Sequence, residues 1–148
     1  MIRRATWEDI PDLVAVAENM VNESPEWGDF DEESMSRTLR NVFRGGGAAF
    51  VAKAPGLPAP IGAAVAFLTT RPFSGERFVA DLAIWVRPEK RGSLLGAKLV
   101  STLEAWAREE EAVEIQLGVS SGIHPDRTGA LYESLGYRAS GLVFVKKL

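Results

Sequence analysis

The chain has 148 residues, 46% hydrophobic and 25% charged, which is the profile of a globular protein rather than a disordered or fibrous one. It contains no cysteine, so a disulfide framework, a thiolate nucleophile and a cysteine-based zinc site are excluded. The net charge of −3 argues against nucleic acid as the main partner, and the longest apolar run, 61–68, is too short to span a membrane.

These properties set the expected organisation. A chain of this length predicts one domain over residues 1–148, held together without a metal. The start of the chain has no apolar leader, so the expected location is cytoplasmic.

Hydrophobic periodicity predicts strands and helices in alternation. In chain order it predicts a strand at 2–5, helices at 6–22 and 31–43, strands at 48–53, 61–70 and 77–86, a helix at 95–109, a strand at 113–119, a helix at 126–135 and strand residues within 137–148. The order βααβββαβαββ indicates an α/β fold, a mixed sheet with helices between its strands. The proline-rich segment 54–60 makes the strands on either side of it antiparallel neighbours.

Three local signals set the ends of the first two helices. The run Thr6-Trp7-Glu8-Asp9 is typical of a capping box, and Asp31 can cap the second helix. Three consecutive glycines at 45–47 then end that helix.

The segment that follows the strand at 77–86 has the composition of an anion-binding turn. It places small residues and basic side chains before a long helix, whose first backbone N–H groups have no intrahelical acceptor. On its own this pattern is more often ordinary loop sequence. The residues are Arg91-Gly92-Ser93-Leu94-Leu95-Gly96-Ala97.

Two stretches together resemble a known family. The run Leu82-Ala83-Ile84-Trp85-Val86-Arg87-Pro88-Glu89-Lys90-Arg91-Gly92, followed by Ala130-Leu131-Tyr132-Glu133-Ser134-Leu135-Gly136-Tyr137, is similar to the GNAT superfamily of acyl-CoA-dependent N-acyltransferases. The resemblance implies a single-domain GNAT-like fold with a mostly antiparallel sheet flanked by helices. It also implies acetyl-CoA as the acyl donor and an amine, on a small molecule or a protein, as the acceptor.

The resemblance assigns cofactor contacts to named residues. In the family, a splayed strand pairs with the pantetheine, which here implicates Ile84, Trp85 and Val86, and the amides of residues 91–97 hold the pyrophosphate. Leu94 stands where the family pattern has its middle glycine, and its amide can still donate if the backbone needs no positive φ there. His124 and Arg127 are further candidates for cofactor contact, and a purely local role for the single histidine also stays open.

Two residues are candidates for proton transfer. Tyr132 matches the family's general-acid tyrosine and stays protonated at neutral pH, so it can donate to the leaving thiolate. Asp81 lies near where family members often carry an acidic base, on the face that alternation assigns to Trp85. Asp81 could equally pair with a buried donor, leaving a chain of water molecules as the base.

The acceptor is expected beside the first two helices. The stretch 23–33 has six acidic residues and no base, so it would attract a cationic amine, although for the acidic run alone solvated surface is the favoured interpretation. The candidate acceptor-binding residues are Trp27, Asp29, Phe30 and Asp31. A non-catalytic acyl-CoA-binding module and a plain interaction domain are the competing hypotheses, and an exposed terminal strand makes a homodimer plausible.

Overall fold

The computed structural model describes residues 1–119 and 122–148 and shows a five-stranded sheet in the order β1-β2-β3-β4-β5. The strands are β1 (Ile2–Arg4), β2 (Gly47–Ala52), β3 (Gly62–Thr70), β4 (Arg77–Val86) and β5 (Ile115–Gln116). The first four pair antiparallel, and β5 pairs parallel to β4. The predicted α/β class and the mostly antiparallel sheet are therefore confirmed.

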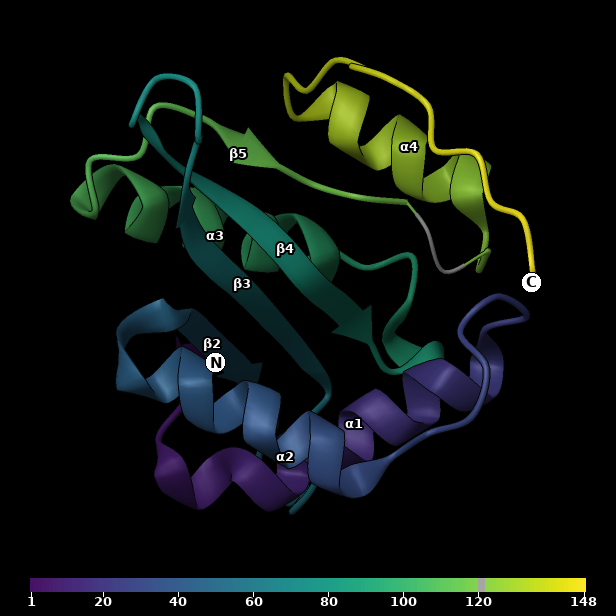
Figure 1. Cartoon of the computed structure of the whole chain (residues 1–148). Helices are drawn as coiled ribbons and strands as arrows, with labels where there is room; N and C mark the ends of the chain where they lie inside the picture. Colours follow the sequence, from purple (N-terminus) through teal and green to yellow (C-terminus); the bar gives the residue numbers. More distant parts are fainter. Residues whose placement is uncertain (120–121) are drawn as a thin grey trace.

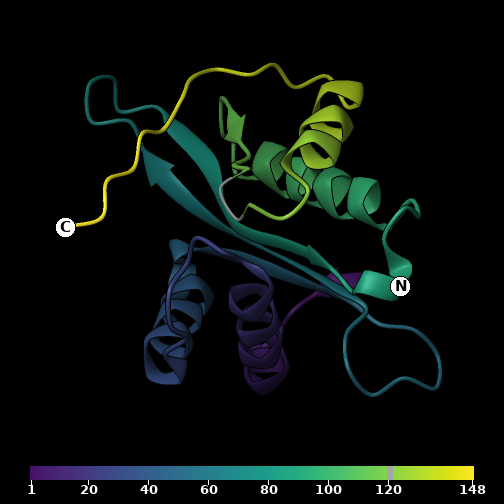
Figure 2. The same ribbon diagram turned by 90° about the vertical axis from the view of Figure 1, so that its right-hand side faces the viewer.

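Helices cover both faces of the sheet. Helices α1 (Ile10–Glu23) and α2 (Glu32–Asn41) lie on one side, and α3 (Leu95–Glu109) and α4 (Pro125–Ser134) lie on the other (Figures 1 and 2). Each side has its own hydrophobic cluster, one around Leu13, Leu39 and Trp85 and one around Leu99 and Leu103. No helix in the described ranges is both long enough and apolar enough to cross a bilayer.

Both predicted helix starts are confirmed in atomic detail. Thr6 and Asp9 form a capping box, and Asp9 also accepts two 2.8 Å hydrogen bonds from the guanidinium of Arg3. This box opens a short 3₁₀ turn, Trp7–Asp9, that continues into α1. The carboxylate of Asp31 accepts a 2.9 Å hydrogen bond from the Ser34 amide and so caps α2.

Strand β4 contains one extra residue, and this changes which face its side chains occupy. In the register with β3, Asp81 pairs with Ala66 and Ala83 pairs with Val65, so Leu82 has no partner and forms a β-bulge. Before the bulge Val79 packs in the α3 cluster, and after it Ile84 and Val86, of opposite parity, pack there too. Regular alternation, which assigned Asp81 to the face of Trp85, is therefore interrupted, because the bulge shifts the side chains that follow by one position.

The end of the chain differs from the prediction. Strand β5 is only two residues long, and no strand is formed within 137–148. This terminal segment instead runs toward the α1–α2 connection, where Lys147 Nζ donates to the Glu26 carbonyl at 3.5 Å. The apolar residues Leu142, Val143, Phe144 and Val145 are each at least 71% exposed. Four consecutive apolar residues have no alternation to select a buried face, and a strand exists only where a partner edge completes its hydrogen bonds.

Candidate active site

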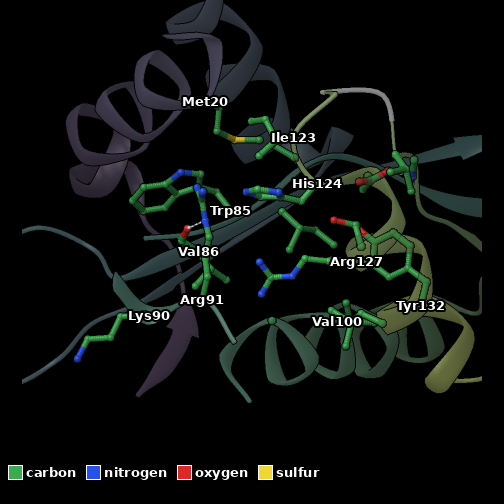
Figure 3. Close-up of a pocket in the computed structure, with 18 of the residues that line it drawn as sticks. Met20, Trp85, Val86, Lys90, Arg91, Val100, Ile123, His124, Arg127 and Tyr132 are labelled. Carbon is green, nitrogen blue, oxygen red and sulfur yellow. Dashed lines mark hydrogen bonds between the residues drawn. The ribbon is translucent and has the colours of Figure 1, made fainter. Parts of the chain in front are cut away.

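A cavity of about 480 Å³ opens where β4 and β5 part, between the α1 side and the α4 side of the sheet. Strand β5 pairs with β4 only at Val79 and Ala80. Beyond that point the Gly118 amide donates to the side chain of Asp81, at 2.8 Å, instead of to a backbone carbonyl. The separation of the two strands leaves one edge of β4 open along the cavity, and Figure 3 shows this region.

Ile84 and Val86, two of the residues predicted to contact the cofactor, have their backbone groups at this open edge. The Arg87 amide donates to Ile61 of the segment before β3, so the backbone groups of Trp85 also face β3. By alternation, the N–H and C=O groups of Ile84 and Val86 face the open edge. Trp85 lines the cavity through its side chain, which is 6% exposed.

The loop before α3 has the backbone geometry of an anion site. Leu94 has φ −74°, so this position needs no glycine, and Gly92, with φ +83°, faces open space. Within the described chain, the backbone amides of Gly92, Leu94, Gly96 and Ala97 have no recorded acceptor. The Leu95 amide is bonded to Ser93 Oγ at 3.3 Å. Four free donors at a helix N-terminus are suited to a diphosphate.

The side chain of Arg91 does not fill this loop. Its Nε donates to the Val86 carbonyl at 2.9 Å, and Nη2 lies 2.7 Å from the carboxylate of Glu23 at the end of α1. Figure 3 shows the bond to Val86 as a dashed line. Arg91 therefore binds one of the backbone groups of the open β4 edge.

Asp81 is a partly buried carboxylate with few donors. Burial raises its pKa to about 6, although the Gly118 amide acts in the opposite direction. No cationic partner is recorded for it in the described residues, so pairing with a buried arginine, the alternative weighed from the sequence, is not what the structure shows. A carboxyl group with this pKa is mostly ionised at neutral pH and still a usable base.

Tyr132 of α4 lies in the same cavity as Asp81 and is 8% exposed. Burial, and then the nearby Asp81 charge, raise the pKa of its phenol well above the ordinary value. The phenol is therefore protonated at every physiological pH. Its ring stacks at a tilt on Tyr137, whose hydroxyl donates to Glu104 of α3 at 2.8 Å.

His124 and Arg127 also line the cavity, at the start of α4. His124 has a left-handed backbone, φ 45°, just before Pro125 begins the helix. In Figure 3 both side chains point from the α4 side toward Trp85 and Arg91. Two basic side chains thus face the open β4 edge from the opposite wall.

Of the four predicted acceptor-side residues, the structure brings one to the cavity. Trp27 lines it, while Phe30 packs against the α1–α2 cluster. Asp29 is exposed, and the carboxylate of Asp31 caps α2. Within the stretch 23–33, the cavity is therefore lined by the aromatic ring of Trp27 and by none of the predicted acids.

The sequence patterns do not indicate Glu23 as a residue of the site. It lies next to the site because it contacts Arg91 and accepts a 3.4 Å hydrogen bond from the indole of Trp85. The available signal was its position, since an acidic residue at the C-terminal end of a helix is unfavourable with the helix dipole.

A family model described as "Acetyltransferase (GNAT) family" matches residues 13–137. The chain therefore belongs to the acetyltransferase (GNAT) family, a family of acyl-transferring enzymes. A search of curated protein sequences found no match.

Solved structures of the same fold are similar over nearly the whole chain. A predicted acetyltransferase with acetyl-CoA from Clostridium acetobutylicum has TM-score 0.80 and 18% identity, covering 99% of this chain and 95% of that one. An aminoglycoside antibiotic 6'-N-acetyltransferase from Acinetobacter haemolyticus has TM-score 0.73 and 18% identity, with 100% and 99% coverage. Glucosamine-6-phosphate N-acetyltransferase from Arabidopsis thaliana has TM-score 0.75 and 15% identity, with 99% and 97% coverage. At these identities the similarity establishes the fold.

Proposed function

We propose that residues 1–148 form one N-acetyltransferase domain that moves an acetyl group from acetyl-CoA to a primary amine. The observation that carries the proposal is one cavity that brings together an open strand edge, part of a loop with free amides, a partly buried carboxylate and a protonated phenol. Acetyl-CoA would supply the thioester whose acyl carbon the amine attacks.

The residues present fit this donor. The free amides of Gly92, Leu94, Gly96 and Ala97 suit a diphosphate, and the side chains of Arg91, His124 and Arg127 add positive charge or hydrogen-bond donors nearby. The backbone groups of Ile84 and Val86 can pair with the amides of a pantetheine arm as a neighbouring strand would. Leu94 fits the loop because its φ is negative.

Asp81 is proposed as the general base. A lysine-like amine of pKa ~10.4 is neutral in about one molecule in 2,500 at pH 7, so the attacking nitrogen needs a group that accepts its proton. Asp81, with a pKa of about 6, is ionised at pH 7 and can take that proton directly or through one water molecule.

Tyr132 is proposed as the acid on the leaving side. Its phenol stays protonated because burial raises its pKa. A donated hydrogen bond stabilises the developing thiolate, whose ordinary pKa resembles that of cysteine, ~8.5. The sulfur then leaves as the thiol with the phenolic proton, the nitrogen keeps the acetyl group, and the proton that Asp81 took from the amine restores the phenol.

The substitution Tyr132→Phe tests this assignment. It should leave the Kd of acetyl-CoA within about twofold and lower kcat about 100-fold, because general acid catalysis contributes ~10²–10⁴. Tyr137→Phe is the matched control, since it removes a neighbouring hydroxyl that is bonded to Glu104 and not in the cavity. Released thiol with a panel of primary amines is the activity readout, and calorimetry measures acetyl-CoA binding.

Three results would change the conclusion. Equal kcat in both tyrosine variants would remove Tyr132 from catalysis. Acetyl-CoA binding without transfer to any amine would indicate a binding module of the same fold. If a concentration 100 times the expected Kd gave no stabilisation, where ~2.7 kcal/mol is expected, the cofactor assignment would fail.

A further inference from the structure

We propose that the Glu23 carboxylate binds cationic amine acceptors, and that Arg91 covers this carboxylate until a diphosphate draws the guanidinium away. The inference rests on the proposed function and names both a substrate class and an order of binding. It is carried by the bonds of Glu23, by its position on α1 and by the two competing uses of Arg91.

Glu23 is the last residue of α1, where the partial negative charge of the helix dipole disfavours an acid. The last turn of α1 carries no basic residue that would offset this. An acid in such a position needs donors from elsewhere in the fold. A position that violates a local rule and is satisfied only by distant residues is a candidate for a functional role.

Two residues of the site, one in β4 and one in the loop before α3, donate hydrogen bonds to Glu23. Trp85 Nε1 donates to Glu23 at 3.4 Å from β4, and Arg91 Nη2 donates at 2.9 Å from the loop before α3. The Glu23 and Arg91 side chains are 28% and 25% exposed, so the pair is partly shielded from solvent. The pair links residues separated by 68 positions, and thereby the acceptor side to the cofactor loop.

Arg91 has a competing partner when the cofactor is present. Its Nε also occupies the Val86 carbonyl, one of the open backbone groups of β4. A diphosphate offers a guanidinium two charge-assisted hydrogen bonds and more negative charge than one carboxylate does. A cofactor that binds the loop amides and the β4 edge therefore competes with both present bonds of Arg91.

Once Arg91 is released, the one donor to Glu23 that remains among residues 1–119 and 122–148 is the neutral indole of Trp85. Glu23 lies on the same helical face as Met20, three residues earlier in α1. Met20, Trp27 and Trp85 line the cavity. The six acids of the stretch 23–33 outnumber the basic side chains that contact it in the described chain, Lys147 at Glu26 and Arg91 at Glu23, and so add negative potential. This environment favours an amine with more than one positive charge over an anionic amino sugar such as glucosamine-6-phosphate.

The test is calorimetric and uses CoA and spermidine as probes on the full chain. For wild type, spermidine should bind at least tenfold more tightly when CoA is bound. Glu23→Gln should bind CoA about three- to tenfold more tightly, because Arg91 is no longer held, and should bind spermidine at least tenfold more weakly in the CoA complex. Glu18→Gln, at an exposed site on the same helix, is the matched control and should change neither affinity by more than twofold.

Glu23→Gln is expected to strengthen CoA binding and weaken spermidine binding, and these opposite changes separate this role from a structural one. If Glu23 merely positioned Arg91 for the cofactor, Glu23→Gln would weaken CoA binding, and that result overturns the proposal. Spermidine binding that is absent, independent of CoA or unchanged in Glu23→Gln also overturns it. Failure of wild type to bind CoA refutes the proposed function itself and is read from the first titration alone.

Discussion

Asp9 is buried and Asp81 is partly buried, and their surroundings give these two aspartates opposite acidities. Asp9, beside β1, accepts two hydrogen bonds from Arg3 and one from the Thr6 amide, and these bonds lower its pKa to about 2. Asp81, in β4, has one recorded side-chain partner, the Gly118 amide, and burial raises its pKa to about 6. Burial alone therefore does not define a role for a carboxylate, and the number and charge of its donors separate a helix cap from a candidate base.

The largest expected difference is in proton affinity. The two carboxyls should titrate about four pH units apart, which is a difference of about 10,000-fold. Carbon-13 NMR of labelled aspartate side chains measures both midpoints directly. Assignment follows from the loss of one resonance in Asp9→Asn and of another in Asp81→Asn. Coincident midpoints near pH 4 would remove the contrast.

Turnover should separate the two aspartates next. Asp81→Asn keeps an acceptor for the Gly118 amide and removes the proposed base, so kcat should fall at least ~100-fold. Asp9→Asn, outside the cavity, should change kcat less than twofold. Steady-state assays with acetyl-CoA and the best amine of the panel provide the comparison. Full activity in Asp81→Asn would mean that water carries the proton without this carboxylate.

The same substitutions should change the free energy of unfolding in opposite directions. At pH 7 Asp9→Asn should cost about 2 kcal/mol, because the pKa of Asp9 is lowered by about two units. This stabilisation is present above pH ~4 and is lost as the pH falls toward 2. Asp81→Asn should be more stable than wild type at pH 7 by about 3 kcal/mol.

The pH dependence of the Asp81 effect checks its cause. A raised pKa means that the folded state holds the proton more tightly, so the Asp81 contribution is complete below pH ~4 and lost as the pH rises through about 6. The advantage of Asp81→Asn should therefore disappear by pH 4. Urea unfolding at several pH values measures it, and an advantage independent of pH would point to packing instead.

The smallest effects are expected from the exposed acids of the stretch 23–33. Asp29→Lys and Asp31→Lys should each raise the acceptor KM about twofold at low salt, and the effect should vanish near 0.5 M salt, where the Debye length is about 4 Å. Asp31→Lys should also lower the melting temperature, because it removes the cap of α2. An unchanged KM in both variants would leave these acids as plain surface.

Local patterns predicted most of the fold. Strand β4 and helix α3 have the predicted bounds, because each combines a clear period with a defined stop, such as Pro88 after the strand. The bulge at Leu82 was not predictable from alternation, since an extra residue is visible only in the register with β3. The predicted strand within 137–148 was wrong, because no partner edge pairs with it in the structure.

The sequence predicted the parts of the candidate site that lie within one short segment. It did not predict the parts that depend on contacts between distant segments. Short motifs predicted the loop 91–97 and Tyr132. Tyr132, Arg91, Gly92, Ser93 and Gly96 line the same cavity, whereas Leu94, Leu95 and Ala97 do not. The contact of Glu23 with Arg91 joins α1 to a loop far along the sequence, so no local pattern encodes it. The raised pKa of Asp81 likewise follows from burial, which depends on the whole fold.

The extra residue at Leu82 has a consequence for how this enzyme can diverge. Because β4 shifts its side chains there, Trp85 belongs to the hydrophobic cluster of α1 and α2, whereas Ile84 and Val86 belong to that of α3. Substitutions that reshape the two N-terminal helices for a new amine are absorbed by one cluster. The packing of Ile84 and Val86 in the other cluster can stay intact, so the two layers of the sheet can change separately except where the Glu23–Arg91 contact joins them.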